Sequence, residues 1–82
     1  MSVTVVDARH LLCPLPVIRT QDSIAKLQPG DALQVRCTDP GVVHDIPAWC
    51  RVHGHELVAS EAVDNEPGGG LVYYFRIQVS DQ

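Results

Sequence analysis

The spacing of the hydrophobic residues changes along the chain in a definite order, and this order restricts the fold more than any other feature of the sequence. The segment Val3–Val6 is short and rich in β-branched residues, which is typical of a strand. Between residues 17 and 27 the apolar positions recur every three or four residues, as on one face of an amphipathic helix. Within residues 32–37 the larger apolar side chains stand at every second position, which indicates a strand with one face on the core.

The second half of the chain continues this alternation of helix and strand. Asp45 is positioned to cap a second helix, because its carboxylate can accept hydrogen bonds from the unpaired N–H groups of a first turn. Pro47 would then lie inside that turn, where its missing N–H costs nothing. Two further strands are expected at Leu57–Ala62 and Leu71–Val79, joined by a polar hairpin loop over Val63–Gly70.

The resulting order is β-α-β-α-β-β, which predicts an α/β two-layer sandwich with two helices on one face of a four-stranded mixed sheet. With 82 residues, of which 45% are hydrophobic, the chain has room for one core. Residues 1–82 are therefore expected to form a single domain. The open face of the sheet would carry mainly polar side chains, Thr4 and Ser60 among them, with Val72 available to a partner.

The charge balance limits the possible partners. Six Lys and Arg against ten Asp and Glu give a net charge of −4 at pH 7, which argues against direct nucleic-acid binding because phosphate contacts need clustered cations. No apolar run approaches the roughly 20 residues of a membrane-spanning helix, and no secretory leader is recognisable. Three cysteines cannot form a complete disulfide set, so a cytoplasmic protein with reduced thiols and no membrane association is expected.

Cys13 is the strongest candidate for chemistry, because it directly precedes a helix whose beginning is marked by Pro14 and Pro16. A thiol there would lie near the positive end of the helix dipole and near unpaired N–H groups, both of which stabilise a thiolate. This placement predicts a pKa lowered from about 8.5 toward about 7, at which roughly half of the thiol is ionised at neutral pH. The spacing also allows a structural alternative, in which Cys13 is a small buried hydrophobic residue.

The other cysteines and the histidines fit structural roles. Cys37 and Cys50 share the apolar faces of their strand and helix, so we predict core thiols, with a resolving role toward Cys13 as the alternative. His10 is a candidate partner or proton donor for the thiolate, although a loop histidine is often simply solvated. No C-x-x-C pair, H-x-x-x-H pair or dinucleotide fingerprint is present, so neither a metal site nor a cofactor is expected.

Several short segments together resemble the TusA/SirA-like sulfur-carrier family. In chain order they are Cys13-Pro14-Leu15-Pro16, Pro29-Gly30-Asp31, Thr38-Asp39-Pro40, Asp45-Ile46-Pro47 and Gly54-His55-Glu56-Leu57. The first of these matches the family's C-P-x-P motif, and the resemblance spans nearly the whole chain. It implies a β-α-β-α-β-β two-layer sandwich, which agrees with the order that hydrophobic spacing predicts.

The resemblance also implies a function. Cys13 would take persulfide sulfur from a cysteine desulfurase or a rhodanese-like donor and pass it to an acceptor protein, with Pro14 and Pro16 holding the loop. In many bacteria the acceptor is a DsrE-like complex and the sulfur ends in tRNA 2-thiouridine, while other members serve molybdenum-cofactor synthesis or sulfur oxidation. The chain would be a sulfurtransferase component more than an enzyme with its own small-molecule substrate, and most simply a monomer.

Two residues beside the thiol depart from the family pattern. The family often has glycine where this chain has His10, and an acidic or small residue where it has Leu15. Helical geometry points Leu15 away from the apolar stripe, so an apolar side chain would be exposed next to Cys13. These two residues are therefore expected to affect the choice of partner.

Two other classes of function fit the sequence. One is a regulatory or protein-interaction module, in which the open sheet face binds a protein and Cys13 is structural or redox-sensing. The other is a small zinc-binding domain built from the cysteines and from His44, His53 and His55. Selective alkylation of Cys13 would favour the carrier, and stoichiometric metal would favour the zinc domain.

Overall fold

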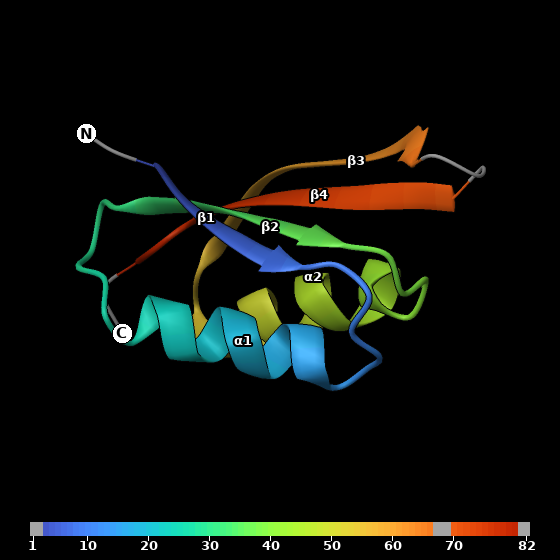
Figure 1. Ribbon diagram of the computed structural model, residues 1–82. Helices are drawn as coiled ribbons and strands as arrows, with labels where there is room; N and C mark the ends of the chain where they lie inside the picture. The colour runs from blue at the N-terminus through green and yellow to red at the C-terminus, as the bar shows by residue number, and fades with distance from the viewer. Residues whose placement is uncertain (1–2, 67–69, 81–82) are drawn as a thin grey trace.

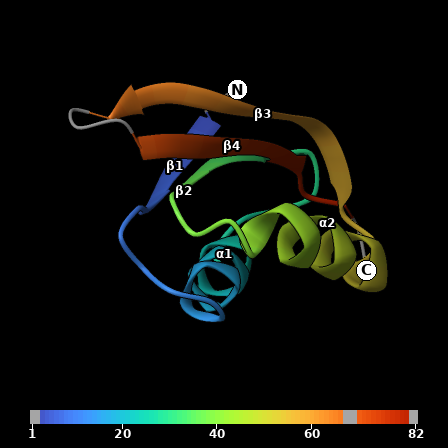
Figure 2. The ribbon, with the colours of Figure 1, turned by 90° about the vertical axis from the view of Figure 1, so that its right-hand side faces the viewer.

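The chain folds into two layers, with a four-stranded sheet on one side and both helices on the other (Figures 1 and 2). The computed structural model describes residues 3–66 and 70–80. Its elements are β1 (Val3–Ala8), α1 (Leu15–Ile24), β2 (Ala32–Cys37), α2 (Val42–His53), β3 (Glu56–Glu66) and β4 (Gly70–Gln78). The α/β two-layer architecture predicted from the hydrophobic spacing is thereby confirmed.

The strands lie in the order β1-β2-β4-β3. β1 and β2 are parallel and are connected through α1, whereas β4 runs antiparallel to both β2 and β3, so the sheet is mixed. Parallel neighbours end at the same edge of a sheet. The loops that follow β1 and β2 therefore lie next to each other, and both lead into helices (Figure 1).

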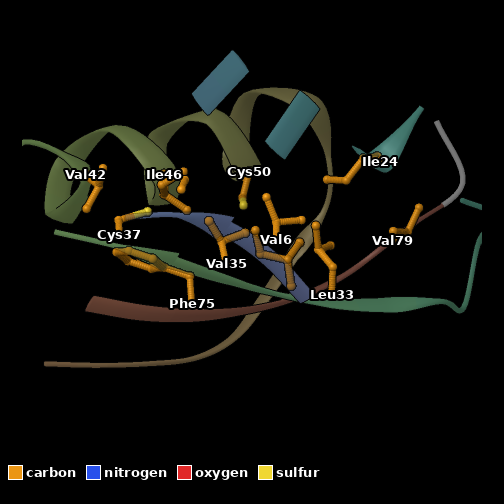
Figure 3. Close-up of a cluster of buried hydrophobic side chains, with 12 residues drawn as sticks. Val6, Ile24, Leu33, Val35, Cys37, Val42, Ile46, Cys50, Phe75 and Val79 are labelled. Atoms are coloured by element: carbon orange, nitrogen blue, oxygen red, sulfur yellow. The ribbon is translucent and has the colours of Figure 1, made fainter. Parts of the chain in front are cut away.

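The core lies between the inner face of the sheet and the inward faces of the helices. Its buried side chains are Val6, Ala8, Ile24, Leu33, Val35, Cys37, Val42, Ile46, Cys50, Phe75, Ile77 and Val79. Three of them, Val42, Ile46 and Cys50, point from successive turns of α2 toward the sheet (Figure 3). The burial of Cys37 and Cys50 confirms the prediction that both are core thiols.

The beginning of α2 differs from the prediction. The helix begins at Val42 after Gly41, so Asp45 lies in the first turn and is not the helix cap. The turn preceding the helix explains the earlier start, because the Val42 N–H donates to the Asp39 carbonyl at 3.2 Å and the Asp45 N–H donates to the Gly41 carbonyl at 3.2 Å. The Asp45 carboxylate is consequently available for another partner.

Pro47 also lies deeper in α2 than predicted. It stands inside the helix and not in the first turn, because the helix begins five residues before it. A proline has no N–H, so the Val43 carbonyl receives no hydrogen bond from it. At the other end Gly54 adopts a positive φ of 77° and ends the helix, and its N–H bonds to the Cys50 carbonyl.

The hairpin of β3 and β4 is longer than the spacing predicts. β3 continues to Glu66 and β4 begins at Gly70, so most of the predicted loop Val63–Gly70 belongs to strands. The remainder of that loop, residues 67–69, lies outside the described residues. Residues 64–66 are polar and have low β propensity, but the pairing of Asp64 and Glu66 with β4 extends the strand through them.

The prediction for the open sheet face was wrong at three positions. A β-bulge between Leu57 and Ala59 shifts the alternation of β3, so that Ser60 pairs with Phe75 on the helix side. Thr4 pairs with Leu33 and also lies on the helix side. Val72 is only 1% exposed and therefore offers no surface to a partner.

Within residues 3–66 and 70–80, neither helix has the length and apolar character needed to cross a lipid bilayer.

Candidate functional site

The candidate site lies where the loop after β1 meets the loop after β2. Cys13 lies near the end of the first loop, separated from α1 only by Pro14, and Asp39 and Gly41 belong to the second loop, which leads into α2. The contact is close enough that a Cβ atom added to Gly41 would lie 3.8 Å from the Cβ of Cys13. The parallel arrangement of β1 and β2 thus brings together residues that are 26 or more positions apart.

Asp39 joins the two loops through its carboxylate. The backbone N–H of Cys13 donates to Oδ2 of Asp39 at 2.6 Å, and the backbone N–H of Gly41 donates to Oδ1 at 3.1 Å. These two hydrogen bonds, first that from Cys13, hold the pKa of Asp39 below its ordinary value, because they stabilise the anion. In the sequence Asp39 stands out only as part of the Thr38-Asp39-Pro40 segment of the family resemblance, and nothing near it in the chain indicates this contact with Cys13.

His10 provides a second connection between the loops. Its backbone N–H donates to the Thr38 hydroxyl at 2.8 Å, and its φ is +67°, in the left-handed region. Glycine adopts this conformation without a steric penalty, and histidine is among the residues that tolerate it. The family's frequent glycine therefore has a backbone explanation at this position, whereas a role for the imidazole of His10 as a proton donor remains a prediction.

The thiol of Cys13 is exposed and donates a hydrogen bond to Oδ2 of Asp45. Asp45 projects from the first turn of α2, 32 positions further along the chain. The structural alternative of a buried Cys13 is therefore wrong. The predicted cap of α2 is instead the hydrogen-bond acceptor of the candidate thiol.

The predicted lowering of the Cys13 pKa is wrong. The hydrogen bond to Asp45, with desolvation and the negative charges of Asp45 and Asp39, raises the pKa of Cys13 to about 11. The N–H of Leu15, the first residue of α1, donates to the Leu12 carbonyl at 2.9 Å and is therefore not free to stabilise a Cys13 thiolate. The two carboxylates therefore favour the protonated thiol.

The two prolines of the motif occupy the start of α1, as predicted. Pro14 precedes the first helical residue and is exposed, and its carbonyl accepts the Ile18 N–H at 3.1 Å. Pro16 is buried in the first turn, and its carbonyl accepts the Thr20 hydroxyl at 2.8 Å. One proline is thus exposed beside the thiol, whereas the other anchors the start of the helix in the core.

His53 and His55, two of the histidines considered as zinc ligands, contact an aromatic ring instead. The rings of His53 and His55 both lie close to Trp49, with centroids 4.6 Å and 5.5 Å from that of the indole. His55 is buried, and its Nδ1 accepts the Ser80 N–H at 3.1 Å. Within residues 3–66 and 70–80, no three His, Cys, Asp or Glu side chains come together as metal ligands.

Iodoacetamide at pH 7 is expected to alkylate Cys13 well before Cys37 and Cys50. Cys13 is exposed, whereas burial shields the other two thiols and raises their pKa to about 12 and about 11. Cys13 should nevertheless react roughly 20-fold more slowly than free cysteine, because a smaller ionised fraction outweighs a more nucleophilic sulfur. Peptide mass spectrometry over time measures both ratios, and a reaction faster than that of free cysteine would contradict the effect of the carboxylates.

Comparison with known proteins places the chain in a family. Residues 4–79 match the family described as Sulfurtransferase TusA. The sulfur carrier protein TusA of Pseudomonas syringae pv. tomato is 43% identical over 61 residues, which cover 74% of this chain and 73% of that protein. A longer Bacillus subtilis protein, YrkF, is 38% identical over 63 residues, which are 76% of this chain and 34% of YrkF.

A solved structure supports the same fold. The SirA-like protein of Desulfitobacterium hafniense superposes with a TM-score of 0.71 at 21% identity, covering 98% of this chain and all of that chain. The match of residues 4–79 extends from the second residue of β1 to the end of β4 and includes Cys13. The chain therefore belongs to the sulfurtransferase TusA family of sulfur carriers.

Proposed function

We propose that this protein carries sulfur as a persulfide on Cys13. The observation that supports the proposal most strongly is the position of this thiol, which is the exposed one among three free cysteines. It lies at the junction of two loops that Asp39 holds together, so the sulfur is accessible while its backbone is restrained. A relay between proteins needs both properties, because each partner must reach the sulfur in a defined orientation.

The sulfur donor would be a cysteine desulfurase or a rhodanese-like protein that itself carries a cysteine persulfide. The Cys13 sulfur attacks the outer sulfur of that persulfide, a new sulfur–sulfur bond forms, and the bond in the donor breaks. The donor cysteine leaves with the electron pair and takes up the proton that Cys13 gives up. The exchange involves no net oxidation, so the step needs no redox cofactor, and the protein would act as a sulfurtransferase component.

The acceptor would be a DsrE-like protein complex, with the sulfur reaching tRNA 2-thiouridine at the end of the relay. The net charge of −4 supports transfer to a protein and not directly to RNA. The protein would act in the cytoplasm, where its thiols stay reduced. It would act as a monomer, because a single exposed site has to serve two partners in succession.

The surroundings of Cys13 support docking to proteins. Three hydrophobic side chains near it in the chain are exposed: Leu12 at 74%, Leu15 at 46% and Ile18 at 46%. Leu15 and Ile18 are three positions apart on α1 and therefore lie on the same side of that helix, and exposed apolar side chains that neighbour each other are typical of surfaces that partners cover. Leu15, at the start of α1, stands immediately beyond Pro14 and is suited to influence which donor or acceptor binds.

A reconstituted relay tests the proposal. The purified protein is incubated with a cysteine desulfurase and cysteine, and its intact mass is recorded before and after addition of a DsrE-like acceptor. We expect a gain of about 32 Da per transferred sulfur and its loss to the acceptor. If neither a desulfurase nor a rhodanese-like donor produces the gain, the carrier proposal is wrong, and the regulatory or interaction module becomes the better explanation.

A further inference from the structure

The proposed function does not explain how the Cys13 thiol loses its proton, although the hydrogen bond to Asp45 stabilises the protonated form. A thiol attacks a persulfide effectively only when its proton is lost before or during the attack, because the anionic sulfur is the nucleophile. With a pKa of about 11, only about one Cys13 thiol in ten thousand is ionised at pH 7. The free thiolate is therefore scarce before a donor arrives, and the contact with a docked protein also restricts the access of water to the site.

Asp45 is the group best placed to remove the proton. Its Oδ2 already accepts the hydrogen bond from the Cys13 sulfur, so no rearrangement is needed before proton transfer. Asp39, the other acidic group that acts on the thiol, has both carboxylate oxygens engaged by backbone N–H groups. The two carboxylates thus have separate tasks, because Asp39 holds the loop and Asp45 faces the sulfur.

We propose that Asp45 takes the proton from the Cys13 thiol as sulfur is acquired and returns it to the departing cysteine of the donor. This role rests on the proposed function, since it describes the step by which Cys13 becomes loaded. The Cys13 S–H bond breaks as the new sulfur–sulfur bond forms, and the electron pair of the broken donor bond leaves with the donor sulfur. Returning the proton to that sulfur restores the Asp45 carboxylate.

The same arrangement distinguishes the empty carrier from the loaded one. In the empty state Cys13 donates to Asp45, which holds the sulfur beside α2. After loading, the Cys13 sulfur is bonded to another sulfur and has no proton to donate. An anionic persulfide would then be repelled by Asp45 and Asp39, which favours an outward orientation toward an acceptor.

The experiment measures the pH dependence of loading in three proteins: the wild type, Asp45→Asn and Asp22→Asn. Asp22 is an exposed carboxylate on α1 and serves as the matched control for loss of one negative charge. Each protein is loaded by the same cysteine desulfurase and cysteine, and the rate of mass gain is expressed relative to the wild type at each pH. This ratio cancels the pH dependence of the donor itself.

We expect the loading rate of Asp45→Asn, relative to that of the wild type, to rise about tenfold per pH unit between about pH 6 and 8. This variant must rely on loss of the Cys13 proton to solvent. The Asp22→Asn ratio should stay constant. Asp45→Glu, which retains a carboxylate, should restore a constant ratio. Alkylation of Asp45→Asn by iodoacetamide should be about tenfold faster than in the wild type, since a lower pKa increases the ionised fraction.

The outcomes separate this role from the proposed function. A constant Asp45→Asn ratio would overturn the proton-transfer role while leaving Cys13 as the carrier. A complete loss of loading in Asp45→Asn that Asp45→Glu does not reverse would also overturn it, because the carboxylate would then be insufficient. If the wild type itself fails to load, the proposed function fails first.

Discussion

Replacing Cys13 with serine is expected to abolish sulfur loading. A serine hydroxyl is a poor nucleophile near neutral pH without an activating base of higher strength, and it cannot form a persulfide. Cys13 is exposed, and its structural contact with Asp39 uses the backbone N–H, so the fold should be retained. Intact-mass measurement after incubation with a cysteine desulfurase and cysteine checks the result, and circular dichroism verifies the fold.

Cys50→Ala is the matched control for this experiment. Cys50 is 1% exposed and belongs to the core, so its removal should cost some stability and leave the loading of Cys13 intact. A Cys13→Ser protein that still gains sulfur would show that another residue accepts it. Loss of loading in Cys50→Ala with a normal fold would instead point to a thiol relay.

Leu33→Ala is expected to lower the free energy of unfolding by about 2–5 kcal/mol. Leu33 lies in β2, between two neighbouring strands, and is 0% exposed, so truncation leaves a cavity that the surrounding structure fills only in part. A loss of about 3 kcal/mol corresponds to a Tm lower by roughly 12–24 °C in a domain of this size. Denaturant titration and thermal melting measure the two quantities.

Leu12→Ala provides the same substitution at an exposed position. Leu12 is 74% exposed, so its truncation should change the free energy of unfolding by less than about 0.5 kcal/mol. Similar losses in the two leucine variants would mean that the core does not lie between the sheet and the helices as described.

The spacing of apolar residues was sufficient to predict the order of the helices and strands, because each helix or strand is one continuous segment with its own spacing. The alternation over residues 32–37 predicted β2 with the correct boundaries. The bulge in β3 was beyond such reasoning, because it depends on how β3 pairs with β4 and moves Ser60 to the helix side. The start of α2 was misplaced for a related reason, since the turn at Asp39 and Gly41 already forms its first hydrogen bonds.

The candidate site was predictable only in part. The C-P-x-P motif indicates Cys13, and the exposure of the thiol agrees with that choice. The direction of its pKa shift was not predictable from the local sequence, because the neighbouring carboxylates come from segments 26 and 32 positions away. The rule that a helix N-terminus lowers the pKa of a nearby thiol considers one helix alone. The pKa of Cys13 is instead raised by Asp45, from the first turn of α2, and by Asp39, from the loop after β2.

The most direct test of the central claim is to locate the transferred sulfur by tandem mass spectrometry. The loaded protein is alkylated and digested without reductant, and the peptides that contain Cys13, Cys37 and Cys50 are compared before and after exposure to an acceptor. We predict an additional sulfur of about 32 Da on the Cys13 peptide alone, which disappears when the acceptor is added. Sulfur on Cys37 or Cys50, or sulfur on Cys13 that no acceptor removes, would contradict the assignment of Cys13 as the carrier.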